Sequence, residues 1–186
     1  MKKFVSVICA VLILLSVFAC AESETRTSVI TVEGIEEEIT ETLHVSEGGY
    51  SLWYQADKFL LNTAEDQTHL FAIDSTPEGV EIGIGTSAAY LLVVPIDIAY
   101  EDTDAFLMEA TGGFDPSVAV IGEPASETLE NGIEIKTVTV TEEATAFTYY
   151  IVTNGEKVLC VSAICPIEAL EGFGARFYDI VKTIEF

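Results

Sequence analysis

The segment TAFTYYIVTNGEKVLCVSAI, residues 145–164, predicts a long β-hairpin. Two runs rich in β-branched and aromatic residues flank Asn154 and Gly155, a pair that accepts the positive φ angles of a tight type I′ turn. We expect both arms to be central strands of an antiparallel sheet, around which the other elements assemble.

Alternation of apolar and polar residues indicates further strands. In residues 38–45, EITETLHV, the apolar side chains share one parity with Glu41 as the exception, which is typical of a half-exposed strand. Residues 80–85, VEIGIG, alternate in the same way. Residues 91–94, LLVV, are apolar on both parities, so we expect both faces of that strand to be covered.

Two helices are expected. The first runs from about 103 to 111, with Asp102 as its cap and Gly112 and Gly113 as its stop. The second opens at Pro166, and its apolar stripe is spaced to face a sheet: Ile167, Leu170, Gly174, Phe177 and Val181. The closing TIEF predicts a short strand. The expected fold class is therefore α+β, a single domain with helices packed on an antiparallel β-sheet.

The N-terminus has the three parts of a secretory signal: Lys2 and Lys3, an apolar run over 4–15, and small residues up to Ala21. Acidic chain follows at once, which does not suit a spanning helix. We therefore expect residues 1–21 to be a signal peptide and the protein to be extracytoplasmic, secreted or at the cell surface.

The fate of Cys20 has two readings. The small residues around it suit a general signal peptidase, whereas VFAC also meets the lipoprotein pattern at both ends, although bulky Phe18 breaks its middle. We favour release after Ala21 and keep a lipid anchor on Cys20 as the alternative. Residues 22–28 then form a polar tether, and residues 29–186 form the domain.

The net charge restricts the partners. The chain has 8 Lys+Arg against 31 Asp+Glu, a net charge of −23, and residues 1–21 hold two of the lysines and none of the acids, so the rest carries 6 − 31 = −25. Nucleic acid is excluded as a partner, and a membrane is expected only through a lipid on Cys20, because both are otherwise bound by basic clusters. A simply soluble acidic exterior is favoured over a specific cationic partner.

Release after Ala21 leaves two cysteines, Cys160 and Cys165. If CVSAIC is a strand, a separation of five residues places the thiols on opposite faces and about 16 Å apart. A disulfide spans only about 4.4 to 6.8 Å between Cα atoms, so we expect two free, buried thiols. Neither His44 nor His69 sits at ligand spacing from them, which disfavours a metal site.

The order of the expected elements is distinctive. An entry segment GYSLWYQADKFLL leads to a meander and a mid-chain helix, then to a hairpin ending VLCVSAICP and to an amphipathic helix and tail, PIEALEGFGARFYDIVKTIEF. This order resembles the PsbP-like fold family, which includes PsbP, the Ran-binding Mog protein and exported bacterial lipoproteins. The resemblance spans nearly the whole chain after the leader. It implies an α/β/α sandwich and a non-enzymatic adaptor that docks on a partner protein, and it assigns no binding residue here.

Two short motifs superficially suggest a nicotinamide-dependent reductase. Residues 83–88, GIGTSA, satisfy Gly-x-Gly-x-x-Ala, and residues 178–182, YDIVK, satisfy Tyr-x-x-x-Lys. The glycine pattern has to open a helix that holds pyrophosphate, but a predicted strand follows it. We therefore interpret Gly83 and Gly85 as small residues on a closely packed strand.

The densest group of oxygen ligands consists of Asp97, Glu101, Asp102 and Asp104. Four carboxylates would supply about half of a calcium shell, but the spacing of a calcium loop is absent. An ordinary helix start, with acids that offset the helix dipole, is favoured, and calcium binding is the alternative.

Catalytic candidates are few. We expect His44 to face outward and His69 to lie at a strand terminus, and no motif pairs either with a nucleophile. Four aromatic residues either line a groove for a ligand or, as we favour, pack within the sheet: Trp53, Tyr54, Tyr149 and Tyr150.

The sequence therefore predicts an exported, non-enzymatic protein that binds another extracytoplasmic protein at the cell surface. The alternative is an extracellular domain that binds calcium or a small ligand, and no cofactor other than calcium is expected. A surface hydrolase has no positive support in the residues.

Overall fold

The computed structural model describes residues 23–186. The elements follow in this order: β1 (Thr25–Val32), β2 (Ile35–Val45), β3 (Ser51–Tyr54), β4 (Phe59–Ala64), β5 (Gln67–Ala72), η1 (Ile73–Ser75), β6 (Tyr90–Ile96), η2 (Tyr100–Asp102), α2 (Thr103–Thr111), β7 (Ala119–Ile121), β8 (Ala125–Thr128), β9 (Glu134–Glu142), β10 (Thr145–Thr153), β11 (Val158–Pro166), η3 (Ile167–Ala169) and α3 (Leu170–Lys182). The expected signal peptide and Cys20 lie outside these residues. No helix in the described part of the chain is long and apolar enough to cross a membrane.

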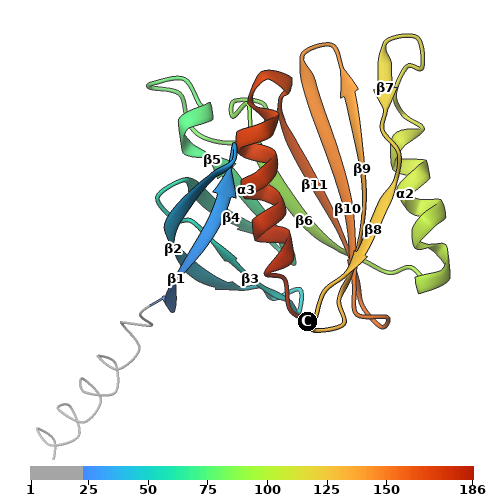
Figure 1. Ribbon diagram of the computed structural model, residues 1–186, viewed down its shortest axis with the longest axis horizontal. Helices are drawn as coiled ribbons and strands as arrows, with labels where there is room; N and C mark the ends of the chain where they lie inside the picture. The colour runs from blue at the N-terminus through green and yellow to red at the C-terminus, as the bar shows by residue number, and fades with distance from the viewer. Residues whose placement is uncertain (1–22) are drawn as a thin grey trace, which may run out of the picture.

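The strands form two antiparallel sheets (Figure 1). The small sheet has the order β1-β2-β3, and the large sheet has the order β4-β5-β6-β11-β10-β9-β7, with β8 also paired to β9. The predicted α+β class and the single domain are confirmed by this arrangement of mainly antiparallel sheet with two packed helices.

The two faces of the large sheet carry different layers. On one face, α3 and the small sheet cover the main core, where Phe177 packs in the same cluster as Tyr150 and Val161. On the other face, α2 covers a smaller cluster in which Leu107 meets Ile151. Because neighbouring residues of a strand point to opposite faces, Tyr150 and Ile151 of β10 belong to different layers.

The predicted hairpin is confirmed. β10 and β11 pair antiparallel and lie between β9 and β6 in the interior of the large sheet. The turn differs from the expected two-residue type, because four residues connect the strands and, of these, Gly155 has a positive φ of 89°. The Oδ1 atom of Asn154 accepts hydrogen bonds from the backbone amides of Glu156 (3.0 Å) and Lys157 (2.9 Å), which stabilises the wider loop.

The first strand corrects the expected tether. Residues 25–28 belong to β1, with Thr25 opposite Thr42 and Ser28 opposite Ile39 of β2. The prediction of a polar tether over 22–28 is therefore wrong from Thr25 onward. Its polar composition reflects exposure of the strand rather than freedom from the fold.

The buried Glu41 explains why the polar strand β1 belongs to the fold. The Glu41 side chain breaks the apolar pattern of β2 and is only 1% exposed. Its carboxylate accepts a hydrogen bond of 2.8 Å from Nε of Arg26 on β1, and the Arg26 guanidinium lies 4.4 Å from the centre of the Trp53 ring. A buried carboxylate needs such a partner, so the segment that seemed to be a tether supplies the compensating charge.

Residues 80–85 do not form the strand that their alternation predicts. They lie in the long connection between η1 and β6, where Ile84 is 63% exposed. Gly79 and Gly85 have φ angles of 80° and 81°, a left-handed conformation that strands do not adopt. The interpretation of Gly83 and Gly85 as strand residues is therefore wrong. A strand, β6, does follow the glycines, so they open no phosphate-binding helix.

The segment 91–94 lies in β6, between β5 and β11. Leu91 and Val93 are fully buried on the α3 face, whereas Leu92 and Val94 are only half-buried on the other face. Both faces are covered as expected, but unequally.

Both predicted helices are present, with different starts. α2 has the expected bounds, but the Asp102 side chain makes no capping hydrogen bond, and the Thr103 hydroxyl donates to the Tyr100 carbonyl oxygen at 2.7 Å instead. α3 begins at Leu170, because Pro166 is the last residue of β11 and η3 comes between them.

The apolar stripe of α3 faces the sheet as predicted. The ring centres of Phe177 and Phe59 lie 5.7 Å apart in the core. Ile167, the first residue of the expected stripe, is 39% exposed because it belongs to η3. The closing residues form a single bridge, with Glu185 opposite Ser51, in place of the expected strand.

Candidate functional site

The four acidic residues of the calcium hypothesis do not converge. Asp104 is paired with Lys136, with Oδ1 and Nζ 2.8 Å apart, and lines a cavity beneath α2. Asp97 lines a different cavity, beside Pro95. Across residues 23–186, no three His, Cys, Asp or Glu side chains form a group suited to a metal ion. The arrangement of Asp97, Glu101, Asp102 and Asp104 therefore lends the calcium hypothesis no support.

Lys136 is the buried cation of the α2 face, with a side chain that is 11% exposed. Its Nζ donates to Oγ1 of Thr103 at 2.9 Å and to Asp104, and it lies 5.1 Å from the centre of the Tyr100 ring. Burial lowers the Lys136 pKa, but Asp104, Glu134 and Tyr100 outweigh burial and raise it. The lysine stays charged and holds the start of α2 on β9.

Neither histidine lies where the sequence suggested. His44 faces inward, with its Nε2 2.9 Å from Oγ1 of Thr68, and this contact joins the small sheet to the large one. His69 is the third residue of β5 rather than a terminal one, and its ring centre lies 5.9 Å from that of Phe71. Burial lowers the pKa of both histidines, so both are neutral at neutral pH.

The four aromatic candidates separate into different environments. Trp53 stacks under Arg26, and Tyr54 is buried in the main core. Tyr149 points to the α2 face, where its ring centre lies 6.4 Å from that of Phe114. Tyr150 packs in the main core, as we favoured, and it also lines a groove.

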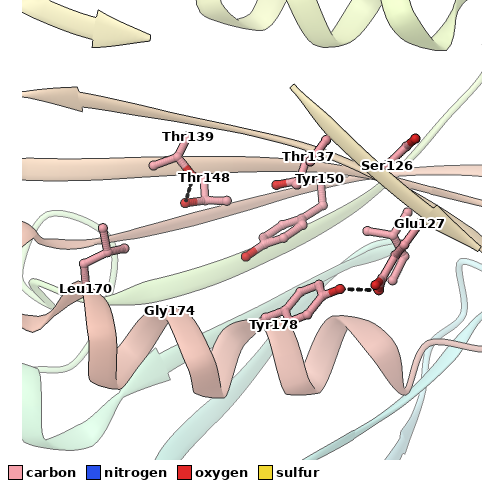
Figure 2. Close-up of a pocket in the computed structure, with 11 residues that line it drawn as sticks. Ser126, Glu127, Thr137, Thr139, Thr148, Tyr150, Leu170, Gly174 and Tyr178 are labelled. Carbon is pink, nitrogen blue, oxygen red and sulfur yellow. Dashed lines mark hydrogen bonds between the residues drawn. The ribbon is translucent and has the colours of Figure 1, made fainter. Parts of the chain in front are cut away.

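This groove lies between α3 and strands β8, β9 and β10 and has a volume of about 430 Å³ (Figure 2). We call it the α3 groove, and eleven residues line it: Ala125, Ser126, Glu127, Ile135, Thr137, Thr139, Thr148, Tyr150, Leu170, Gly174 and Tyr178. Gly174 leaves the helix wall without a side chain, and a Cβ added there would lie 3.3 Å from Cδ1 of Leu170. The missing side chain widens the space between helix and sheet.

The hydroxyl of Tyr150 points along the groove, away from Glu127 (Figure 2). Tyr150 is only 4% exposed and its hydroxyl makes no hydrogen bond within residues 23–186, yet this hydroxyl is not enclosed, because Ser28 Oγ is the single fully buried side-chain polar atom without a partner in that range. Burial raises the pKa of Tyr150, with smaller contributions from Tyr178 and Cys165, so the hydroxyl remains protonated. Because this hydroxyl reaches the open space of the groove, a ligand with an oxygen acceptor would take the place of water as its partner.

Two further pairs of polar groups in the groove are hydrogen-bonded within the protein. The Tyr178 hydroxyl donates to Oε1 of Glu127, and burial together with this contact raises the Tyr178 pKa. The hydroxyls of Thr139 and Thr148, on neighbouring strands, share a hydrogen bond of 3.0 Å. The groove therefore combines a hydroxyl-lined floor with a tyrosine hydroxyl that points along it.

Sequence reasoning did not single out the threonines of the floor. Thr137 and Thr139 share the parity of Ile135 on β9, and Thr148 lies between Ala146 and Tyr150 on the same face of β10. Hydroxyl side chains on the same parity as Ile135 of β9 and as Ala146 and Tyr150 of β10 were the available signal. Their neighbours across the strands were needed to recognise it.

The cysteines agree with their prediction. Cys160 and Cys165 are both free, and they belong to the clusters on opposite faces of the large sheet. Cys165 is buried and Cys160 is half-buried. Neither lines the α3 groove.

No protein-family model matches this chain, and a comparison with curated proteins finds no match either.

Proposed function

We propose that this chain is an exported, non-enzymatic binding protein that holds a small ligand in the α3 groove. The observation that carries the proposal is the hydroxyl of Tyr150, which is held by a buried ring, reaches the open space of the groove without a protein hydrogen bond from residues 23–186, and points along the groove. A hydroxyl that a buried ring holds in place at the wall of a groove is a fixed hydrogen-bonding group, and such groups orient the ligand in small-molecule sites.

The size and lining of the groove support a small ligand. Its volume of about 430 Å³ falls in the range of about 300–1,000 Å³ that is typical of small-molecule sites. Apolar walls from Leu170 and Ile135 accompany a few placed hydroxyl groups, which is the usual composition of such a site. These features favour a small ligand over the protein partner that the sequence alone suggested, because the hydroxyls lie within the groove rather than on an open face.

Binding is favoured over catalysis by the same lining. No histidine, cysteine or lysine is among the residues that line the groove. A hydroxyl nucleophile needs an adjacent base, and the groove carboxylate of Glu127 accepts its hydrogen bond from Tyr178 instead.

The proposed binding protein is also exported and has a PsbP-like fold. The secretory pattern of residues 1–21 supports a role outside the cytoplasm. The long hairpin that passes through Pro166 into α3, with α3 packed on the sheet and α2 on its other face, supports the PsbP-like resemblance. We infer from the resemblance that the protein is a binding module, since the fold alone carries no activity.

The test is to fill the groove from its helix wall. The variant Gly174→Leu places a side chain between α3 and the threonine floor, and it replaces a glycine with a good helix former, so the fold is expected to persist. Threonine-methyl NMR would be recorded while a library of neutral, anionic and cationic fragments is added to the natural protein and to the variant. We expect fragment-dependent shifts at Thr137, Thr139 and Thr148, and their loss in Gly174→Leu.

The matched control is Gly172→Leu on the same helix. Gly172 lines a different cavity, near Glu33, so this variant changes helix propensity equally and leaves the α3 groove open. The proposal is wrong if no fragment shifts the groove methyls, or if both variants retain the shifts equally.

A further inference from the structure

The charge of the α3 groove restricts the ligand. None of the eleven lining residues is a lysine, an arginine or a histidine, and Glu127 is the single charged side chain among them. The chain as a whole has a net charge of −23. A carboxylate or phosphate ligand would therefore meet no counter-charge in the groove and would lie beside the carboxylate of Glu127, which is unfavourable.

The hydroxyl groups of the floor form a compact pattern. Thr139 lies opposite Thr148, and Thr137 lies opposite Tyr150, so two adjacent cross-strand pairs present four hydroxyl side chains to the groove. A hydroxyl both donates and accepts hydrogen bonds. The floor therefore suits a molecule whose own groups also do both, which is the property of an alcohol rather than of an ion.

Apolar surface lies around these hydroxyls. The rings of Tyr150 and Tyr178 are nearly parallel, with an interplanar angle of 18° and centres 6.1 Å apart. Leu170 and Ile135 add aliphatic surface. A flat ring with C–H groups on its faces and oxygens around its edge would match both parts of the lining.

From these observations we propose that the α3 groove binds an uncharged polyhydroxylated ring, which is the chemistry of a neutral sugar unit. The inference rests on the proposed function, since it names the ligand class of the same groove. The hydroxyl of Tyr150 donates to an oxygen of the ring, and the floor threonines exchange hydrogen bonds with its other hydroxyls. A free sugar and a unit of a longer glycan present the same chemistry.

The experiment uses sugars that differ in charge on a similar ring. The neutral set is glucose, galactose, mannose and N-acetylglucosamine, the anionic set is glucuronate and galacturonate, and each is titrated to about 50 mM while the threonine methyls are followed by NMR. We expect at least one neutral sugar to shift the methyls of Thr137, Thr139 and Thr148 saturably, and neither uronate to do so. Chitotetraose, titrated beside N-acetylglucosamine, separates the sources, since a glycan site binds the tetramer more than fourfold more tightly.

Two tyrosine variants give the matched control. Tyr150→Phe removes the inward hydroxyl and is expected to weaken binding of the neutral sugar at least tenfold, whereas Tyr149→Phe, on the opposite face of β10, leaves the affinity unchanged. Both variants keep the ring, so both are expected to fold.

The results also separate this inference from the proposal that precedes it. If no neutral sugar shifts the groove methyls, if a uronate binds as well as its neutral counterpart, or if Tyr150→Phe binds as the natural protein does, the sugar assignment is overturned. If the fragment library still shifts those methyls in a Gly174-dependent manner, the groove remains a ligand site of another class. If neither sugars nor fragments bind there, both proposals fall.

Discussion

The two faces of the large sheet hold their helices in different ways. α3 buries Phe177, Ile180 and Val181 completely against the main core, whereas α2 buries Leu107 as its single apolar residue and is anchored beside it by Lys136. α3 is held by a broad apolar contact, whereas α2 is held by a small apolar contact together with the ion pair between Lys136 and Asp104. A helix that is held by a broad contact tolerates a gap beneath one part of it, and the α3 groove occupies such a gap.

The largest expected effect comes from the apolar contact of α3. Phe177→Ala removes a fully buried ring that packs against Phe59 and Phe173, and it should lower the free energy of unfolding by about 4 kcal/mol. Leu107→Ala on α2 should cost about 2 kcal/mol, because its cluster is smaller and its helix lies at the surface. Urea denaturation measures both values, and equal losses would remove the distinction between the faces.

The ion pair between Lys136 and Asp104 should have the next largest effect on the free energy of unfolding. Asp104→Ala leaves the ammonium of Lys136 with Glu134 at 3.8 Å as its nearest carboxylate, and it should cost about 1–2 kcal/mol. Lys136→Met keeps the length and removes the charge, so its cost should stay below about 1 kcal/mol. The control is Asp74→Ala, which breaks an exposed pair with Lys58 at 3.7 Å and should change stability by less than about 0.5 kcal/mol. If Asp104→Ala lowers the free energy of unfolding no more than Asp74→Ala does, the ion pair with Lys136 does not hold α2 on the sheet.

A pair of tyrosines then tests the gap beneath α3. Tyr50 is buried and its hydroxyl lies 2.7 Å from Oγ1 of Thr68, so Tyr50→Phe should cost about 1 kcal/mol. Tyr150→Phe removes a hydroxyl that makes no protein hydrogen bond within residues 23–186 and is open to the groove, so it should leave the unfolding midpoint unchanged. A loss at Tyr150 equal to that at Tyr50 would show that the Tyr150 hydroxyl already has a structural partner.

The smallest effect concerns the thiols of β11, one on each face. Burial raises the pKa of Cys165 to about 11, and burial also raises the pKa of Cys160. The raised pKa leaves about one Cys165 thiol in a thousand ionised at pH 8, so alkylation by iodoacetamide should be slow in the folded protein. Mass spectrometry should find half-buried Cys160 modified before Cys165, and both modified rapidly in urea. Faster modification of Cys165 would mean that the α3 face opens more readily than the α2 face.

The regular elements of the main core could be predicted from local pattern. The hairpin of β10 and β11 and the apolar stripe of α3 follow from side-chain periods and turn residues that lie close together in the sequence. The same reasoning failed for residues 80–85, because alternation also occurs in a loop whose glycines adopt positive φ angles. It failed for residues 25–28, because a polar edge strand has no apolar pattern to reveal it.

The candidate site could be predicted only in small part. Tyr150 was one of four aromatic candidates, but nothing local separated it from Tyr149, which points to the other face of β10. The acidic residues from Asp97 to Asp104 seemed to form one cluster, yet Asp104 is occupied by Lys136, a residue 32 positions away. Local density of a residue type therefore indicated a site where the fold provides none.

The sequence by itself determined the α+β class, the central hairpin, both helices and the two unpaired thiols. Each of these follows from the backbone geometry of residues that are near in the chain, so the period and the turn chemistry are sufficient. Only the tertiary structure decided the partner of Glu41, the ion pair of Lys136 with Asp104, and the α3 groove. These depend on which strands become neighbours and on how far a helix stands from a sheet, and such distances arise from packing between segments that no local pattern encodes.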